Sequence, residues 1–311
     1  MKIMLAPMEG VVDHRMRGIL TTIGGYHSCV SEFIRVTNQP LPRKVFHRIS
    51  PELNDGGATP SGIPVVIQLL GGHPETMAIN ASKAAAFGAP AIDINFGCPS
   101  RLVNRKAGGA VLLKDPARLY AIVKAVRLAV AAQIPVTAKL RLGYENTDLA
   151  VDNALAVQEA GADSITVHAR TRLDGYSTPA RWEWLARINE HTAIPVVANG
   201  DINSIEDYLR CRQISGCDDV MIGRGAIATP DLAKQIRCHQ QGIDYKPMEW
   251  DDIRPLLLQM GASMEDGVKD KHIGMRIKQW LVYLKRDYIE AQHCFNRIRR
   301  TTDFSAMKTI L

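Results

Sequence analysis

Short runs of apolar and β-branched residues recur along the first 240 or so residues, and a longer stretch with helical periodicity follows each run. This alternation predicts βα units whose strands lie side by side in a parallel sheet. Eight runs have the length and composition of buried strands. They cover residues 3–6, 28–33, 65–69, 91–95, 136–140, 164–167, 195–198 and 219–222.

The stretches between the runs carry helix start and stop signals. Residues 116–130 begin after Asp115 and predict an amphipathic helix, and residues 148–160 predict another that Gly161 ends. Eight such repeats are typical of a (β/α)8 TIM barrel, an α/β fold that usually takes about 250 residues. An open doubly wound sheet is the alternative.

The pattern changes after Gly242. No further strand-like run occurs, and residues 251–264, 274–288 and 289–300 predict packed helices. We therefore predict a catalytic barrel over residues 1–242 and an all-α helical domain over residues 243–311.

The composition is that of an ordinary folded protein, with 46% hydrophobic and 23% charged residues. No run approaches the roughly 18 apolar residues of a membrane span, and the N-terminal residues lack a cleavable signal pattern. We expect a cytoplasmic protein that does not bind membranes. The six cysteines have neither C-x-x-C nor zinc-type spacing, so we expect no disulfide framework and no metal.

The net charge of +6 is concentrated at one end. Residues 271–311 hold nine Lys and Arg against three Asp and Glu, whereas the first 270 residues are balanced. A neutral body with a basic end indicates a polyanionic partner. A solvated basic helix face would have the same composition, and charge alone leaves both interpretations open.

Residues suited to binding or catalysis follow all eight predicted strands, at the end of the barrel where active sites lie. In chain order they are Pro7, Met8 and Glu9; Glu32 and Arg35; Gln68; Asn95 and Cys98; Lys139 and Arg141; His168 and Arg170; Asn199, Gly200 and Asp201; Gly223, Arg224 and Gly225. A single one could be a cap or a satisfied core group, but a set covering every strand indicates an active site.

The glycines after the last two strands predict a phosphate site. Residues 199–201 and 223–225 offer backbone N–H groups for close approach to an anion, together with one guanidinium. A mononucleotide cofactor is therefore expected. Lys139 and His168 would face its ring, where a cation stabilises the negative charge that a flavin gains on reduction.

The most informative motif covers residues 93–100, Asp-Ile-Asn-Phe-Gly-Cys-Pro-Ser. Its Pro and Gly predict a loop that carries Cys98 into the barrel mouth. A nucleophilic thiol needs a His base and an acyl substrate, whereas a proton donor needs only to face a reducing centre, so the donor role fits a flavin better. A Schiff base on Lys139 is a competing chemistry, but it leaves Gln68 and Cys98 without a role.

Several short motifs occur in order along the chain. They are Ala6-Pro7-Met8, Asn95-x-Gly97-Cys98-Pro99 with Gly109-Ala110 eleven residues on, Lys139-Leu140-Arg141, and the segments 167–171, 198–201 and 221–225. Together they resemble the tRNA-dihydrouridine synthases over nearly the whole chain. Residues 44–48 and 276–281 are most similar to the bacterial C-type enzymes, which act on uridine 16.

The resemblance implies an FMN-binding TIM barrel followed by a helical domain that binds tRNA. It implies FMN contacts from Pro7, Met8, Glu9, Gln68, Lys139, His168, Asn199, Gly200, Asp201, Gly223 and Arg224. Cys98 would be the proton donor, and Asn95 would hold the target uracil. Further tRNA contacts are implied for Arg35, Tyr176, Arg276, Lys278 and Gln279.

The implied reaction is reduction of the C5–C6 bond of one uridine, position 16 in the D-loop, with NADPH or NADH as reductant. FMN N5 would deliver hydride to C6, and Cys98 would protonate C5. A dehydrogenase of free pyrimidines, of the dihydroorotate or dihydropyrimidine type, shares these parts but gives no reason for the basic helices. An RNA-binding protein with the barrel as scaffold is a third hypothesis. No stable protein partner is implied, and we expect a monomer.

Overall fold

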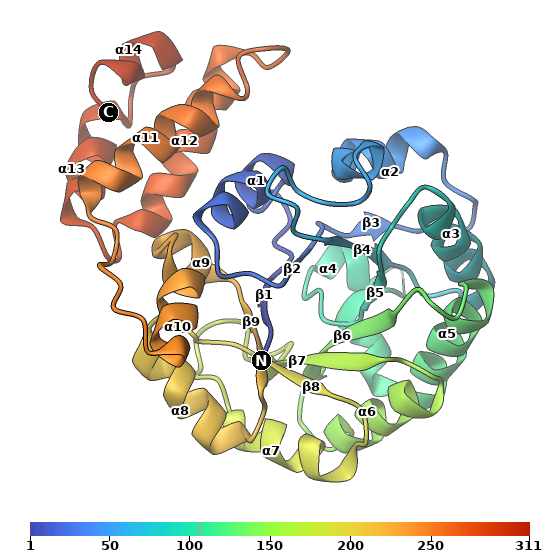
Figure 1. Cartoon of the computed structure of the whole chain (residues 1–311). Coiled ribbons are helices and arrows are strands. Elements are labelled where there is room, and N and C mark those ends of the chain that lie inside the picture. The colour runs from blue at the N-terminus through green and yellow to red at the C-terminus, as the bar shows by residue number, and fades with distance from the viewer. Residues whose placement is uncertain (106) are drawn as a thin grey trace.

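Eight parallel strands close into a barrel in the computed structural model, which describes residues 1–105 and 107–311 (Figure 1). Their bounds are β1 (Ile3–Leu5), β2 (Ser28–Val30), β4 (Val65–Leu70), β5 (Ile92–Asn95), β6 (Val136–Gly143), β7 (Ser164–Thr171), β8 (Val196–Asn199) and β9 (Asp219–Ile222). β1 pairs with both β2 and β9, and β2 pairs with β4, so the ring closes. The TIM-barrel prediction is confirmed, and the open sheet is excluded.

The second predicted strand, residues 28–33, is interrupted. A short strand β3 (Ile34–Arg35) resumes the pairing with β4, but the register slips by one residue relative to β2. Ser31 bridges the break, because its N–H donates to the Val66 carbonyl at 2.9 Å and its Oγ accepts from the Gln68 N–H at 3.1 Å. Such irregularities are common beside active sites, and Phe33 from this segment lines the cavity described below.

Helices surround the barrel (Figure 1). They are α1 (His14–Ile23), α2 (Arg43–Ile49), α3 (Pro74–Ala86), α4 (Arg101–Asn104), α5 (Pro116–Ala129), α6 (Ala150–Glu159), α7 (Trp182–His191), α8 (Ile205–Ser215), α9 (Arg224–Ala228) and α10 (Leu232–Gln241). Local chemistry sets several boundaries. Asp115 and Ser204 accept backbone N–H groups at the starts of α5 and α8, and Gly216 ends α8 in the left-handed conformation.

Strands β6 and β7 run three and four residues past their predicted ends. Arg141, His168 and Arg170 therefore lie inside strands, where all three are buried. An apolar pattern cannot predict these extensions, because they contain charged side chains. Such side chains can be buried where they find hydrogen-bond partners. The longer strands carry these cationic groups to the carboxyl end of the barrel.

The C-terminal part is helical, as predicted. It contains α11 (Trp250–Ala262), α12 (Asp270–Leu284), α13 (Ile289–Ile298) and α14 (Phe304–Lys308). The last helix was not predicted, because five residues show no periodicity. It depends on tertiary packing, since the Phe304 ring lies where a Cβ on Gly261 would stand. Among the described residues, no helix is both long and apolar enough to cross a membrane.

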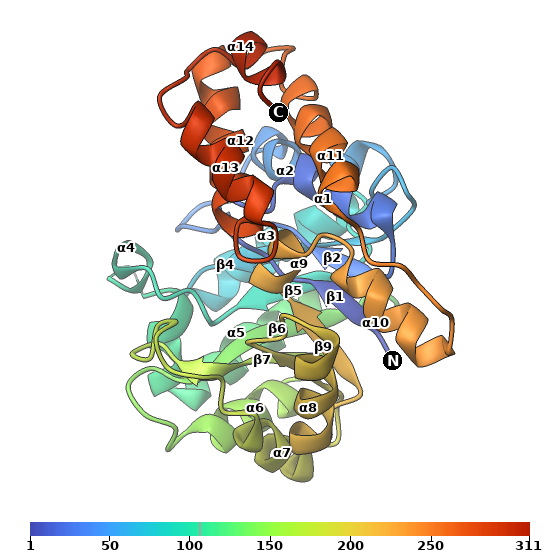
Figure 2. The same cartoon turned by 90° about the vertical axis from the view of Figure 1, so that its left-hand side faces the viewer.

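These helices stand beside the barrel next to α1 and α9 (Figures 1 and 2). Trp280 of α12 anchors them, because its indole N–H donates to the Ile227 carbonyl of α9 at 3.0 Å. The hydrogen bond between Trp280 and Ile227 brings α12 close to the mouth of the barrel. The division of the chain into two domains at residue 242 stays a prediction.

Candidate active site

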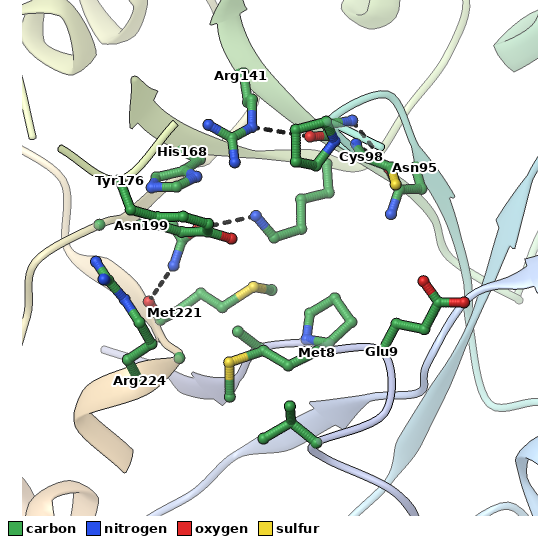
Figure 3. A pocket seen from close by; sticks show the side chains of 18 of the residues that line it. Met8, Glu9, Asn95, Cys98, Arg141, His168, Tyr176, Asn199, Met221 and Arg224 are labelled. Carbon is green, nitrogen blue, oxygen red and sulfur yellow. Dashed lines mark hydrogen bonds between the residues drawn. The ribbon is translucent and has the colours of Figure 1, made fainter. Parts of the chain in front are cut away.

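A cavity of about 510 Å³ opens at the carboxyl ends of the strands, within the range of about 300–1,000 Å³ that small-molecule sites occupy (Figure 3). Cys98, Asn95 and Tyr176 line it. So do all the predicted cofactor contacts, which are Pro7, Met8, Glu9, Gln68, Lys139, His168, Asn199, Gly200, Asp201, Gly223 and Arg224. The fold thus brings together residues that lie more than 200 positions apart in the sequence.

Lys139 is fixed across the cavity floor. Its Nζ donates to Asn199 Oδ1 at 2.8 Å, and Asn199 Nδ2 donates to the Met221 carbonyl at 2.8 Å (Figure 3). Burial, together with the charge of Arg141, lowers the pKa of Lys139 to about 7. The group can therefore gain a proton when negative charge appears beside it.

Positive groups crowd the wall next to Lys139. Burial lowers the pKa of His168 well below its usual value, and the nearby cations Arg141 and Lys139 add to the effect, so the imidazole is neutral at pH 7. Asp201 is the acid that balances this wall, with Arg170 Nη2 at 2.5 Å and Arg224 Nη2 at 3.3 Å. An excess of cations around one carboxylate suits an anionic ligand.

The glycines of the last two loops are required by close packing. At Gly200, with φ of +121°, a Cβ would stand 3.0 Å from His168 Cδ2. At Gly225 a Cβ would stand 2.2 Å from the Ile202 carbonyl oxygen. A side chain at either position would therefore displace the loops that form this wall of the cavity.

Cys98 lies in a loop held from two sides. Asn95 Oδ1 accepts the N–H groups of Gly97 and Cys98, each at 2.9 Å, and Asn104 Nδ2 donates to the Cys98 carbonyl at 3.1 Å. The thiol faces the cavity on the side away from Met8 (Figure 3). Burial raises the pKa of the Cys98 thiol, so it is protonated at neutral pH and is suited to donate a proton.

Four predicted tRNA contacts lie outside the cavity. Arg35 borders a separate groove of about 570 Å³ that is also lined by Arg105 and His73. The other three are on α12 and bond to the protein's own backbone. Arg276 Nη1 and Gln279 Nε2 reach the Gly10 carbonyl at 2.7 and 3.0 Å, and Lys278 Nζ reaches the Thr301 carbonyl at 3.0 Å.

Other lining residues were not assigned a role from the sequence. Arg141 was noticed at a strand end, and it braces the Cys98 loop because its Nε donates to the Gly97 carbonyl at 2.8 Å. Tyr283 comes from α12, and Phe33 from the interrupted second strand. Its strand-end position identified Arg141 as a candidate, but no local signal marks Tyr283.

Comparisons with known proteins show the family of this chain. The family described as dihydrouridine synthase (Dus) matches residues 4–308. The tRNA-dihydrouridine(16) synthase of Pseudomonas putida is 47% identical over 311 residues, covering 100% of this chain and 96% of the relative. The protein of the same name from Pseudomonas syringae pv. tomato is 49% identical over 311 residues, covering 100% and 98%.

Among solved structures, a 2-naphthoyl-CoA reductase in complex with 2-naphthoyl-CoA superimposes with a TM-score of 0.58 at 13% identity. The match covers 78% of this chain and 50% of that one. Likeness at this low identity shows the barrel fold alone.

Proposed function

This chain belongs to the dihydrouridine synthase family, and we propose that it reduces the C5–C6 bond of uridine 16 in tRNA to 5,6-dihydrouridine, using bound FMN and NADPH or NADH. Full-length relatives carry the name of that activity. The observation that carries the proposal is the convergence of cationic and amide side chains from β4, β5, β6, β8 and the start of α9 on one cavity beside Cys98.

The cavity fits a flavin mononucleotide. The loops at 199–201 and 223–225, with the Arg224 guanidinium, would hold its phosphate. Lys139 would stabilise negative charge on the ring, and its lowered pKa leaves room for proton uptake when that charge appears. The remaining contacts would come from Pro7, Met8, Glu9, Gln68 and His168. When bound, FMN supplies a hydride from N5 to C6 of the uracil.

Cys98 would complete the reduction as general acid. Hydride addition at C6 leaves an electron pair at C5, and the thiol proton forms the new C5–H bond, leaving a thiolate that solvent reprotonates. A thiol whose pKa is raised by burial remains protonated at neutral pH. The Asn95 bonds to the loop backbone would keep the sulfur directed at the substrate position.

The substrate uridine must leave its stack to enter the cavity, since a stacked base is out of reach. Asn95 and Tyr176 are the proposed contacts to the flipped base. Arg35, Arg276, Lys278 and Gln279 are the proposed contacts to the surrounding tRNA. Residues 243–311 would act as a tRNA-binding domain and residues 1–242 as the catalytic domain.

Replacing the thiol tests the mechanism. Cys98→Ala should retain FMN and its reduction by NADPH, while dihydrouridine formation falls by roughly 100-fold or more, the usual effect of losing a general acid. Flavin absorbance, stopped-flow reduction and mass spectrometry of position 16 in tRNA measure these quantities. Cys294→Ala, which removes a buried thiol on α13, is the matched control. Equal losses in both half-reactions would contradict the assignment.

A further inference from the structure

A chain of hydrogen bonds runs beneath the cavity, from the barrel interior to the Cys98 loop. It begins at two backbone N–H groups, those of Gly97 and Cys98, which both donate to Asn95 Oδ1 at 2.9 Å. A backbone N–H can only donate, so the oxygen of this amide must face the loop. The two donors therefore identify which end of the Asn95 amide is the oxygen.

The orientation of the Asn95 amide in turn determines that of Gln68. With its oxygen committed, Asn95 turns Nδ2 toward Gln68 and donates to Oε1 at 2.8 Å. Gln68 must then turn its own Nε2 away, and it donates to Asp93 Oδ2 at 2.7 Å. Reversing either amide would place two N–H groups or two oxygens face to face, which is unfavourable for buried groups.

The hydrogen-bond chain ends at the Asp93 carboxylate, which has one oxygen left to accept from Gln68. Asp93 Oδ1 is occupied by Thr137 Oγ1 at 2.6 Å, so Oδ2 remains for Gln68. Asp93 and Gln68 are buried, with 2% and 0% of their surfaces exposed. A proton on Asp93, if present, would sit on Oδ1 toward Thr137, and Oδ2 would still accept. Both ionisation states give the chain the same direction.

We propose that Asp93 is a positioning residue for the Cys98 loop. By accepting from Gln68 it sets the Gln68 amide, which sets the Asn95 amide, whose oxygen then holds the backbone of Gly97 and Cys98. The role assigned to the loop rests on the proposed function, but the hydrogen-bond chain does not. Asp93 itself stays out of contact with the cavity, so it acts through its neighbours.

Hydrogen–deuterium exchange of the protein as purified tests this directly. Asp93→Leu removes the acceptor at similar size and leaves the Gln68 amide free to reverse. The amides of Gly97 and Cys98 should then exchange at least ~10-fold faster, because they lose their acceptor. Asp93→Asn should restore protection close to wild type, since its carbonyl oxygen accepts from Gln68 and its amide donates to Thr137 Oγ1.

Thr137→Val is the matched control. It disturbs the same buried cluster by removing the other hydrogen bond to Asp93, but it leaves the path to Asn95 intact. Loop amides should exchange as in wild type. Unchanged loop exchange in Asp93→Leu, or equal acceleration in Thr137→Val, would overturn the proposal.

Gln68→Met provides a second route if Asp93→Leu does not fold. It breaks the middle of the hydrogen-bond chain and should accelerate exchange of the same amides at least ~10-fold, and unchanged loop exchange in this variant would also overturn the proposal. Where Asp93→Leu folds, the double variant should exchange no faster than either single variant. Additive effects would show that Asp93 acts independently and would overturn the proposal. No tRNA or NADPH enters these measurements, so a failure of the proposed function would appear separately, as absence of dihydrouridine in the wild-type assay.

Discussion

At the scale of single residues, Arg224 is more exposed than Arg141, the other guanidinium among the described residues that line the cavity. Its side chain is 41% exposed, with one 3.3 Å ion pair to Asp201, and it lies 4.5 Å from the centroid of the Tyr176 ring. Arg224→Ala should weaken FMN retention, because the phosphate would lose a charge-assisted partner. Flavin content after dialysis measures this. Arg212→Ala on α8, similarly exposed and paired with Asp218, is the control. Full occupancy in the Arg224 variant would refute the phosphate contact.

Lys139 should make stability depend on pH. Its pKa is about 7 in the fold and 10.5 ordinarily, so between these values the unfolded chain binds a proton that the folded chain lacks. Its contribution to the free energy of unfolding therefore rises as pH increases through this window. Lys139→Met should lose that rise.

Urea unfolding of flavin-free protein at about pH 7.5 and about pH 9.5 checks the prediction. The stability of the wild type, relative to that of Lys139→Met, should be greater at the higher pH. Parallel changes in both proteins would mean that Lys139 keeps an ordinary pKa in the fold.

At the scale of elements, α12 braces the loop after β1. Arg276, with 11% of its side chain exposed, donates to the Gly10 and Val11 carbonyls and pairs with Asp13 at 3.2 Å. The Gly10 N–H in turn donates to Glu32 Oε1 at 2.5 Å. The helix thus holds the segment that follows Pro7, Met8 and Glu9 in the cavity wall.

Arg276→Ala should therefore reduce FMN retention as well as tRNA binding, and should lower the melting temperature by a few °C, since charge-assisted hydrogen bonds contribute about 1.5–3 kcal/mol. Flavin content and thermal unfolding are the measurements. Lys278→Ala, on the same helix, should leave flavin content unchanged. If Arg276→Ala affects tRNA affinity alone, the bracing role is wrong and the residue is a simple tRNA contact.

At the scale of the whole molecule, the excess positive charge lies on the C-terminal helices. Arg297, Arg299 and Arg300 at the end of α13 are exposed and suited to contact phosphates. Replacing all three with Ala should weaken tRNA binding. It should also reduce the slope of log affinity against log salt by up to roughly 2 to 3, because each phosphate contact releases counterions.

Titration of tRNA binding at several salt concentrations tests this prediction, with flavin reduction by NADPH staying near wild type. Arg187→Ala is the control, since Arg187 is exposed on α7, far from α13 in both views (Figures 1 and 2). Identical salt slopes in the triple variant and wild type would place the tRNA elsewhere on the surface.

The sequence by itself determined the parts of this protein that depend on local chemistry. Apolar runs predicted eight strands, because a strand covered on both faces must be apolar along its length. Residues 219–222 coincide with β9, and Asp115 marked the start of α5. The motifs also predicted residues that line one cavity, because these residues lie toward or just after the carboxyl ends of strands, and parallel strands place those ends together.

Tertiary structure alone decided what depends on residues far apart in the chain. The ring closes through β2 and β4, whose register slips around Ser31. Arg276 and Gly10 are 266 positions apart, yet a hydrogen bond joins them beside the cavity wall, and no pattern in the sequence predicts this contact. The proposed role of Asp93 depends on Gln68, because β4 places Gln68 beside both Asp93 and Asn95 of β5. Periodicity reports which face of an element is buried, but the partner of a buried polar group is set by packing between elements, and no local pattern encodes it.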